Sequence, residues 1–286
     1  MSVRGCPPWA AMGNHGSPAP TASGGSASAG THSYVFDGAS IFGANTSTIP
    51  WGDFGLNDEP PFGDMGPWSV SCWFKTSFTT GYQELLYWKD ASGGDWARVL
   101  IGNPAVPSSY ALIYQSTASA FDGTTGIGLG GAGAAPWMGP AAGSVAVGDG
   151  AWHHLVLTCE GVNTTGQISM YYDSVLVATG TQTASVMDPD RGFYNGKGVG
   201  YFLNGSIFQT GLWAGTELSS VQVATLYNSG SASLLSAYSP TPSIYYTFGD
   251  DADPANPDTT ASCYDGGAGG YTLAFSVAAT IVTDSP

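Results

Sequence analysis

The sequence predicts an all-β protein, a sandwich of two antiparallel sheets with one short helix near residues 219–229. Three observations predict it: short runs alternate apolar and polar residues, turn residues separate these runs, and one segment alone has helical spacing. Gly and Pro number 42 and 18 among 286 residues, and both favour turns over helices. A hydrophobic content of 43% excludes a wholly disordered chain.

The clearest strand is expected over residues 68–75, because its side chains alternate with period two. The residues expected on its core face are Trp68, Val70, Cys72 and Phe74. Those expected on the opposite face are Ser69, Ser71, Trp73 and Lys75.

Similar runs predict further strands over residues 33–37, 83–88, 96–101, 110–115, 152–160, 167–172, 175–179, 199–203 and 206–213. Asp173 and Ser174 have the chemistry of a hairpin turn between two of them. The Gly- and Ala-rich stretch 121–143 predicts a long surface loop. The helix is expected to start at a capping box of Ser219 and Gln222 and to stop at Gly230.

Composition divides the chain into three parts. Residues 1–31 are rich in Gly, Ser, Pro and Ala and predict an arm without a core of its own. Residues 32–230 carry the predicted sandwich, and residues 231–286 form an extension with a strand that returns to it.

Charge and apolar patterning exclude several classes of partner. The net charge is −15, with six Lys and Arg residues in all, so a nucleic-acid partner is not expected. No apolar run is long enough for a membrane span. The N-terminal residues lack the apolar core of a secretory signal, which predicts synthesis and assembly in a host cytoplasm. Four separated cysteines without a CxxC pair argue against zinc and iron–sulfur sites.

Five stretches carry distinctive motifs: 34–40 (YVFDGAS), 68–75 (WSVSCWFK), 150–158 (GAWHHLVLT), 168–177 (ISMYYDSVLV) and 202–230. In this order they resemble the strands of laminin-G-like, concanavalin-A-like jelly-roll domains. The resemblance implies a two-sheet antiparallel jelly roll. Residues 244–250 resemble the strand that follows this domain in many tailed-phage virion proteins.

These resemblances imply a non-enzymatic structural protein of a virus particle, a capsid decoration or a fibre or spike component. Its expected partners are other virion proteins, further copies of itself and host-surface glycans, and its expected location is the virion. The alternative is a secreted or surface lectin-like module that binds carbohydrate. A fold used for many purposes does not by itself assign a function.

A glycan hydrolase is the third hypothesis, and the carboxylates argue against it. Retaining hydrolysis needs two carboxyl groups about 5–5.5 Å apart, yet glutamate occurs only at positions 59, 84, 160 and 217. Asp188 and Asp190 have a suitable spacing, but Pro189 and Arg191-Gly192 predict a loop there. His153 and His154 are adjacent on a strand and therefore point to opposite faces, so they cannot share one metal.

Calcium and glycan sites are expected at the loops. The laminin-G and pentraxin-like families bind calcium at one rim, and the best positional matches here are Asp95, Asp188 and Asp190. The competing interpretation is that these aspartates cap turns; the acidic loop 250–253 is an equal candidate. Trp137 is expected either as an exposed platform for a sugar ring or as an anchor for its loop.

The resemblance also bears on the cysteines. In the pentraxin relatives a disulfide joins the strand that holds Cys72 to the strand that holds Cys159. Here Cys159 is offset by three residues, which predicts that it faces the other way. Since a cytosolic product would also be reduced, no disulfide is expected.

Overall fold

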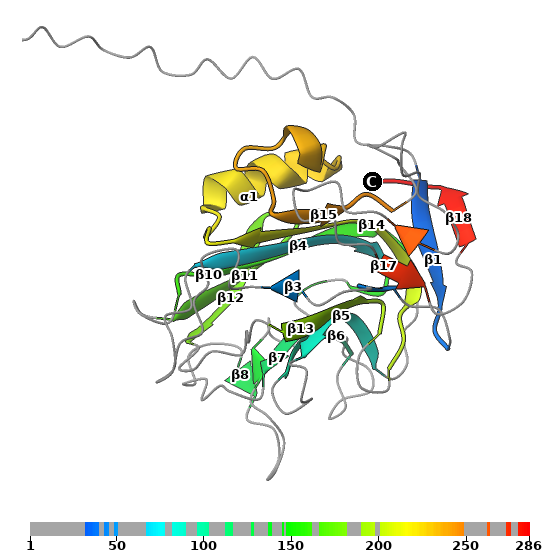
Figure 1. The fold of residues 1–286 in the computed structure, drawn as a ribbon, viewed down its shortest axis with the longest axis horizontal. Helices are drawn as coiled ribbons and strands as arrows, with labels where there is room; N and C mark the ends of the chain where they lie inside the picture. The colour runs from blue at the N-terminus through cyan, green and yellow to red at the C-terminus, as the bar shows by residue number, and fades with distance from the viewer. Residues whose placement is uncertain are drawn as a thin grey trace, which may run out of the picture.

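The computed structural model describes residues 32–39, 43–45, 49–50, 67–77, 82–89, 96–102, 112–116, 127–128, 137–138, 145, 147–161, 166–181, 190–197, 201–248, 262–263, 273–275 and 280–286. Within them the chain forms two antiparallel sheets and one short α-helix, so the predicted fold class is confirmed. The sheets lie face to face as two layers (Figure 1). The predicted arm, residues 1–31, lies outside the described residues.

The first sheet has eight strands in the described part of the chain. Its order is β12-β11-β10-β4-β14-β1-β18, and β15 pairs with the far half of β14. These strands are β1 (His32–Asp37), β4 (Trp68–Lys75), β10 (Trp152–Cys159), β11 (Gln167–Tyr172), β12 (Val175–Thr181), β14 (Asn204–Ala214), β15 (Ile244–Tyr246) and β18 (Thr280–Thr283).

The second sheet has ten strands among the described residues. Its order is β16-β17-β2-β13-β5-β6-β7-β9-β8, with β3 on β13. They are β2 (Gly43–Asn45), β3 (Ile49–Pro50), β5 (Gln83–Lys89), β6 (Trp96–Ile101), β7 (Leu112–Ser116), β8 (Ile127–Gly128), β9 (Trp137–Met138), β13 (Asp190–Asn195), β16 (Ser262–Cys263) and β17 (Leu273–Phe275).

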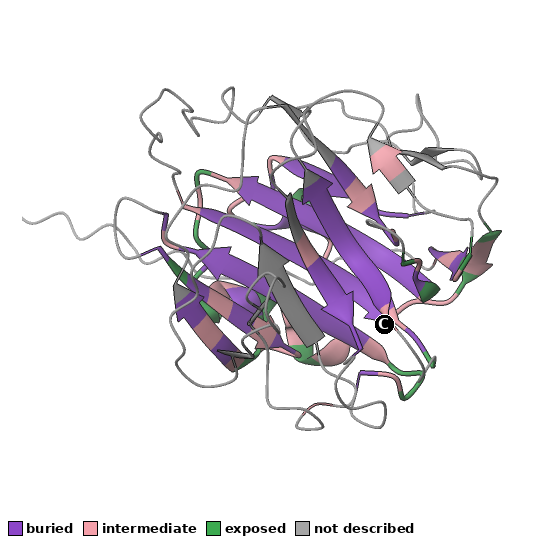
Figure 2. Ribbon diagram, turned by 90° about the horizontal axis from the view of Figure 1, so that it is seen from below, coloured by how far each residue is buried: buried purple, intermediate pink, exposed green. Residues whose placement is uncertain are grey.

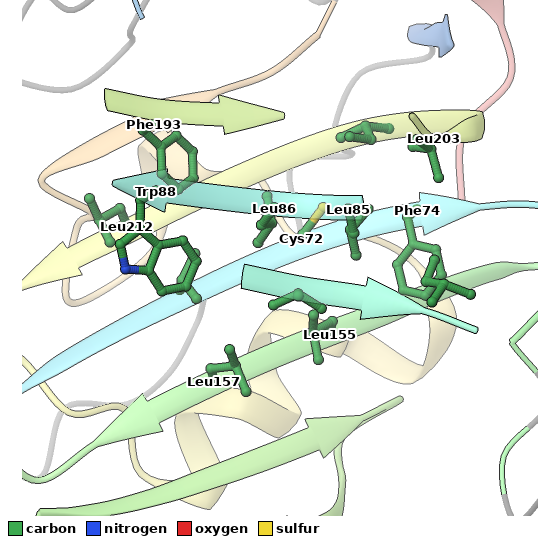
Figure 3. Packing of buried hydrophobic residues seen from close by; sticks show 14 of the residues in the cluster. Cys72, Phe74, Leu85, Leu86, Trp88, Leu155, Leu157, Phe193, Leu203 and Leu212 are labelled. Carbon is green, nitrogen blue, oxygen red and sulfur yellow. The ribbon is translucent and has the colours of Figure 1, made fainter. Parts of the chain in front are cut away.

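The main core fills the space between the sheets. All four residues expected on the core face of β4 belong to it and are at most 1% exposed. They meet residues of the second sheet such as Trp88 and Phe193, whose rings stack at 6.2 Å (Figure 3). Each strand presents alternate residues to this space, and the described residues of the central strands β4, β14 and β5 are mostly buried (Figure 2).

The outer side of the eight-stranded sheet is buried as well, which the period-two pattern of β4 did not indicate. Helix α1 (Ser220–Tyr227) and the segment after it, which contains Leu235 and Tyr238, cover it (Figure 1). Ser69 is 0%, Ser71 3% and Trp73 2% exposed. The Ser69 hydroxyl donates to the Thr216 carbonyl at 3.0 Å and accepts from the Leu218 N–H at 2.9 Å, so a buried serine here fastens the segment that leads into the helix.

The helix and hairpin form as their local sequences predict. The Ser219 side chain accepts from the Gln222 N–H, and the Gln222 side chain accepts from the Ser219 N–H, which completes the capping box. The last residue of the helix is Tyr227, and Asn228 caps it in a left-handed conformation. This cap lies two residues before the predicted stop at Gly230. Asp173 and Ser174 have φ values of 49° and 66°, as a type I′ hairpin turn requires.

Three sequence expectations about local structure were wrong. Residues 190–195 form strand β13, which pairs with β5, rather than a loop. Residues 127–128 and 137–138 form short strands inside the expected surface loop. In the expected strand 199–203, the described residues contribute an isolated bridge between Lys197 and Phe202. In the first two cases, pairing with other strands outweighed a local composition that suggested a loop. In the third case, an apolar run did not form a strand ladder.

Candidate functional site

Polar and aromatic side chains gather on the outer face of the ten-stranded sheet. Phe193 and Trp88 are cross-strand neighbours in the core, so the next pair along, Tyr194 and Tyr87, points outward. Their rings are 5.6 Å apart. Tyr87 in turn lies opposite Arg98 on β6. We define the tyrosine–arginine face as Tyr82, Glu84, Tyr87, Arg98, Tyr194 and Tyr201.

A buried ion pair organises this face. Arg98 Nη1 donates to Glu84 Oε1 at 2.9 Å, and the Glu84 side chain is 0% exposed whereas that of Arg98 is 17% exposed. A register shift in β5 between Glu84 and Leu86 leaves both Leu85 and Leu86 in the core. This bulge directs Glu84 to the outer face, which is how bulges commonly re-aim a side chain beside a site.

The same carboxylate also positions the loop after β13. Glu84 Oε2 accepts the Tyr201 N–H at 3.3 Å. The Tyr201 ring is 40% exposed and lies 5.0 Å from the Tyr82 ring. Burial, followed by the nearby Tyr201, raises the pKa of Tyr82, and Arg98 opposes them. The Tyr82 phenol therefore stays a hydrogen-bond donor at neutral pH.

The structure places the backbone of Trp137 in line with this face. In the ladder Arg98 lies opposite Gln115 of β7, and Gln115 lies opposite Trp137 of β9. Trp137 thus occupies a strand, not a loop, in the cross-strand row that contains Tyr87 and Arg98. Its side chain lies outside the described residues.

The predicted calcium ligands are not tested. Asp95 and Asp188 lie outside the described residues, as does the acidic loop 250–253. The backbone of Asp190 begins β13 and pairs with Pro50, but its side chain is not described. Where the chain is described, no group of three His, Cys, Asp or Glu side chains is placed to hold a metal ion.

The two adjacent histidines point to opposite sides of β10, as expected. His153 Nδ1 lies 2.8 Å from Asp173 Oδ2, and its Nε2 lies 3.0 Å from Asp149 Oδ1. Burial lowers the pKa of His153, but the hydrogen bonds to Asp173 and Asp149 outweigh burial, and the pKa is raised. This imidazole joins the loop that contains Asp149 to the hairpin that contains Asp173.

His154 forms a Ser–His pair that is unsuited to catalysis. Its Nε2 lies 2.7 Å from Ser71 Oγ, but the two residues are 1% and 3% exposed. Asp173 Oδ1 accepts from the His154 backbone N–H at 2.8 Å rather than from the ring. Burial lowers the pKa of His154 to about 3, and its ring stacks on Trp73 at 4.7 Å. A substrate cannot reach this pair, and no described acid orients the ring.

Both described cysteines are free thiols, as expected, but the expected orientation of the Cys159 side chain was wrong. Cys72 and Cys159 are free and buried, and both face the core, not opposite sides. Cys72 lies opposite Leu155, whereas Cys159 lies opposite Trp68. They are therefore four residues apart along the ladder, roughly 13 Å, which is too far for a disulfide. Burial raises the pKa of Cys72 to about 12 and that of Cys159 to about 11.

The sequence contained part of the signal for the tyrosine–arginine face. Glu84 and Arg98 are the charged residues inside two apolar strands, and alternation places Arg98 opposite the core face. Tyr201 could not be found this way, because it reaches Glu84 across 117 residues. Its position depends on the pairing of β13 with β5, which no local pattern specifies.

Comparison with known proteins gives the fold class. No family model matches the sequence, and no curated protein matches it. A Bacteroides ovatus protein, provisionally assigned to carbohydrate binding, has a similar structure with a TM-score of 0.56 and 13% identity. The match covers 90% of this chain and 60% of that one, so the chain spans less than two thirds of its neighbour.

Two further solved structures are similar over a smaller part. A pentraxin from Limulus polyphemus gives a TM-score of 0.46 at 11% identity, covering 69% of this chain and 82% of that one. A sialidase carbohydrate-binding module from Ruminococcus gnavus, bound to sialyllactose, gives 0.47 at 12% identity, covering 68% and 96%. The chain is a jelly-roll β-sandwich protein, as its two antiparallel sheets and the Bacteroides ovatus structure show. At such low sequence identity, structural similarity establishes the fold and not the function.

Proposed function

We propose that this protein is a carbohydrate-binding module that binds glycans on the tyrosine–arginine face without cleaving them. The observation that carries the proposal is a group of four tyrosines near one arginine on the outer side of the ten-stranded sheet, of which Tyr201 is exposed and Tyr87 is buried. Aromatic rings offer flat apolar surfaces to the faces of sugar rings, and their hydroxyls hydrogen-bond. Together with the guanidinium they supply the few oriented polar groups that a ligand site needs.

The geometry favours binding through Tyr201. Its ring is exposed, while Glu84 holds both its backbone and Arg98 in place from a buried position. A site supported in this way is ordered before the ligand arrives, which lowers the entropic cost of binding. The Bacteroides ovatus neighbour, which is provisionally assigned to carbohydrate binding, agrees with this proposal.

The test is a glycan screen followed by calorimetry on the best ligand. Tyr201→Ala should weaken binding about tenfold or more, whereas Tyr201→Phe, which keeps the ring, should weaken it far less. Val221→Ala, a change at a residue that is 74% exposed on the opposite side of the sandwich, should leave affinity unchanged. Equal affinities for Tyr201→Ala and wild type, or release of sugar from the ligand, would contradict the proposal.

The virion role, which was the main expectation from the sequence, has less support. It rests on the resemblance of the C-terminal strand, and none of the three solved structures named above is a virion protein. The lectin-like alternative is therefore the better-supported function. A virion location and virion partners remain predictions from the sequence.

A further inference from the structure

The tyrosine–arginine face contains one cation and one anion, and these two side chains are bound to each other. Arg98 Nη1 lies 2.9 Å from Glu84 Oε1, and the Glu84 side chain is 0% exposed. The other Glu84 oxygen accepts the Tyr201 N–H at 3.3 Å. Both oxygens thus accept from donors, which is the pattern of an ionised carboxylate. Because a buried carboxylate is costly unless it is paired, the positive charge of Arg98 balances Glu84.

This pairing leaves the six residues of the face without a net charge. Burial, and after it the nearby Tyr201, raises the pKa of Tyr82, so this phenol adds no negative charge at neutral pH. A carboxylate of a ligand that approached Arg98 would also approach Glu84. The like charges would repel each other where water screens them poorly, and the net charge of −15 of the chain adds to the repulsion.

We infer that Glu84 determines the charge specificity of the glycan site, so that the site binds uncharged sugars in preference to sugars that carry carboxylates. This inference rests on the function proposed above. An uncharged sugar ring can lie on the exposed Tyr201 ring without bringing a charge that Glu84 repels. Glu84 acts from beneath the surface as a positioning residue for Arg98 and Tyr201, and it also cancels the positive charge that would attract an acidic ligand.

A further cation has its register position near this face. Lys89 lies two residues after Tyr87 on β5, opposite Gly192 on one side and Trp96 on the other. Alternation places this position on the outer side of the sheet, one row from Arg98, and the Lys89 side chain lies outside the described residues. The experiment therefore separates the contribution of Lys89 from that of Arg98.

The test compares sugars that differ by a single carboxylate. Calorimetry on the full chain uses oligosaccharides of glucose and galactose and their uronic-acid counterparts, in which a carboxylate replaces the C6 hydroxymethyl group. The wild type should bind the better uncharged sugar at least about tenfold more tightly than its acidic counterpart. Added salt should tighten binding of the acidic sugar, because it screens repulsion, and should leave binding of the uncharged sugar unchanged.

Glu84→Gln is the decisive variant. An amide has one accepting oxygen and one donating nitrogen, so it cannot accept from both Arg98 and Tyr201, and it leaves the Arg98 charge unbalanced. The ratio of acidic to uncharged affinity should rise about tenfold or more, and it should stay raised when Lys89→Met is added. Glu217→Gln, which changes the net charge equally at an exposed residue before α1, should leave the ratio unchanged. If thermal melting shows that Glu84→Gln does not fold, the wild-type ratio and its salt dependence decide.

The outcomes distinguish this inference from the proposed function. If no sugar of either kind binds, or if Tyr201→Ala binds as wild type does, the proposed function fails and the inference fails with it. Tighter binding of the acidic sugar by the wild type, lost in Tyr201→Ala and weakened by salt, overturns the inference alone. So does a folded Glu84→Gln variant whose ratio equals that of the wild type, or a gain that Lys89→Met removes.

Discussion

At the residue scale, the two neighbouring histidines have opposite electrostatic roles. The two carboxylates raise the pKa of His153, so its protonated form is stabilised by folding. Burial lowers the pKa of His154 to about 3, so folding requires its neutral form. Asp173 contacts both residues, because its carboxylate binds the His153 ring and accepts from the His154 backbone N–H.

These shifts predict a stability maximum near pH 6.5, the ordinary pKa of histidine. The His153 contribution is complete below that pH and is lost as the pH rises through its raised pKa. The His154 contribution is complete above that pH and is lost on acidification, by up to about 1.4 kcal/mol per pH unit. Urea unfolding from pH 5 to 8.5 should show both slopes.

His153→Gln should flatten the alkaline slope, and His154→Gln the acid slope. The comparison uses slopes, because either change also lowers the absolute free energy of unfolding. If wild type and His153→Gln lose stability equally between pH 6.5 and 8.5, the clamp between Asp149 and Asp173 is not the cause.

At the scale of elements, the β11–β12 hairpin contains an identifiable strain. Ser174 has a φ of 66°, in the left-handed region that suits glycine. Because an L side chain costs about 1 kcal/mol or more in that region, Ser174→Gly should raise the free energy of unfolding by about 0.5–1 kcal/mol, with glycine's larger chain entropy partly offsetting the gain.

The matched control is Ser236→Gly in the short 3-10 turn Leu235–Ala237, where φ is not positive. It should be neutral or slightly destabilising. Denaturant midpoints that shift in the same direction for both variants would show that turn strain does not explain the effect.

The strand β4 illustrates why an element's surroundings matter as much as its pattern. Its core face is apolar, as expected, but its opposite face is also buried and carries Ser69, Ser71 and Trp73. The Trp73 ring stacks on His154 at 4.7 Å and on Tyr227 of α1 at 5.6 Å, and the His154 and Tyr227 rings also stack on each other at 6.3 Å. The sheet thus has a second, smaller core on its outer side, and helix α1 is attached through it.

At the scale of the whole molecule, charge is distributed unevenly. Among the described residues, Lys75 pairs with Asp284 of the C-terminal segment and Arg98 with Glu84. Asp284 also accepts from Trp152 Nε1 at 3.1 Å, so the end of the chain is fastened to β4 and β10. The chain carries a net charge of −15, which is the setting in which a cation would stabilise acidic loops.

The calcium expectation can therefore be tested on the whole molecule. If Asp95, Asp188 and Asp190 bind the ion, calcium at about 10⁻⁴–10⁻³ M should raise the melting temperature relative to chelator. Asp188→Asn should reduce that rise, and Glu217→Gln, at an exposed position before α1, should not. Identical melting in calcium and chelator would exclude the site.

The sequence by itself determined those strands, caps and turns that depend on residues close together in the chain. Strands over 68–75, 96–101 and 167–172 form with the predicted bounds, because period-two alternation reports which residues face a core. The capping box of Ser219 and the turn at Ser174 follow from hydrogen bonds and φ preferences within a few residues.

Only the tertiary structure decided which elements meet. Residues 190–195 became a strand because β5 and β2 pair with them, although Pro189 and Gly192 suggested a loop. Glu84 meets Arg98 on the next strand along the chain, but it meets Tyr201 only because a segment 117 residues away converges on the same sheet face. The burial of Ser71 likewise depends on a helix that starts about 150 residues later. Such contacts depend on long-range pairing, and the residues next to each partner in the chain carry no information about it.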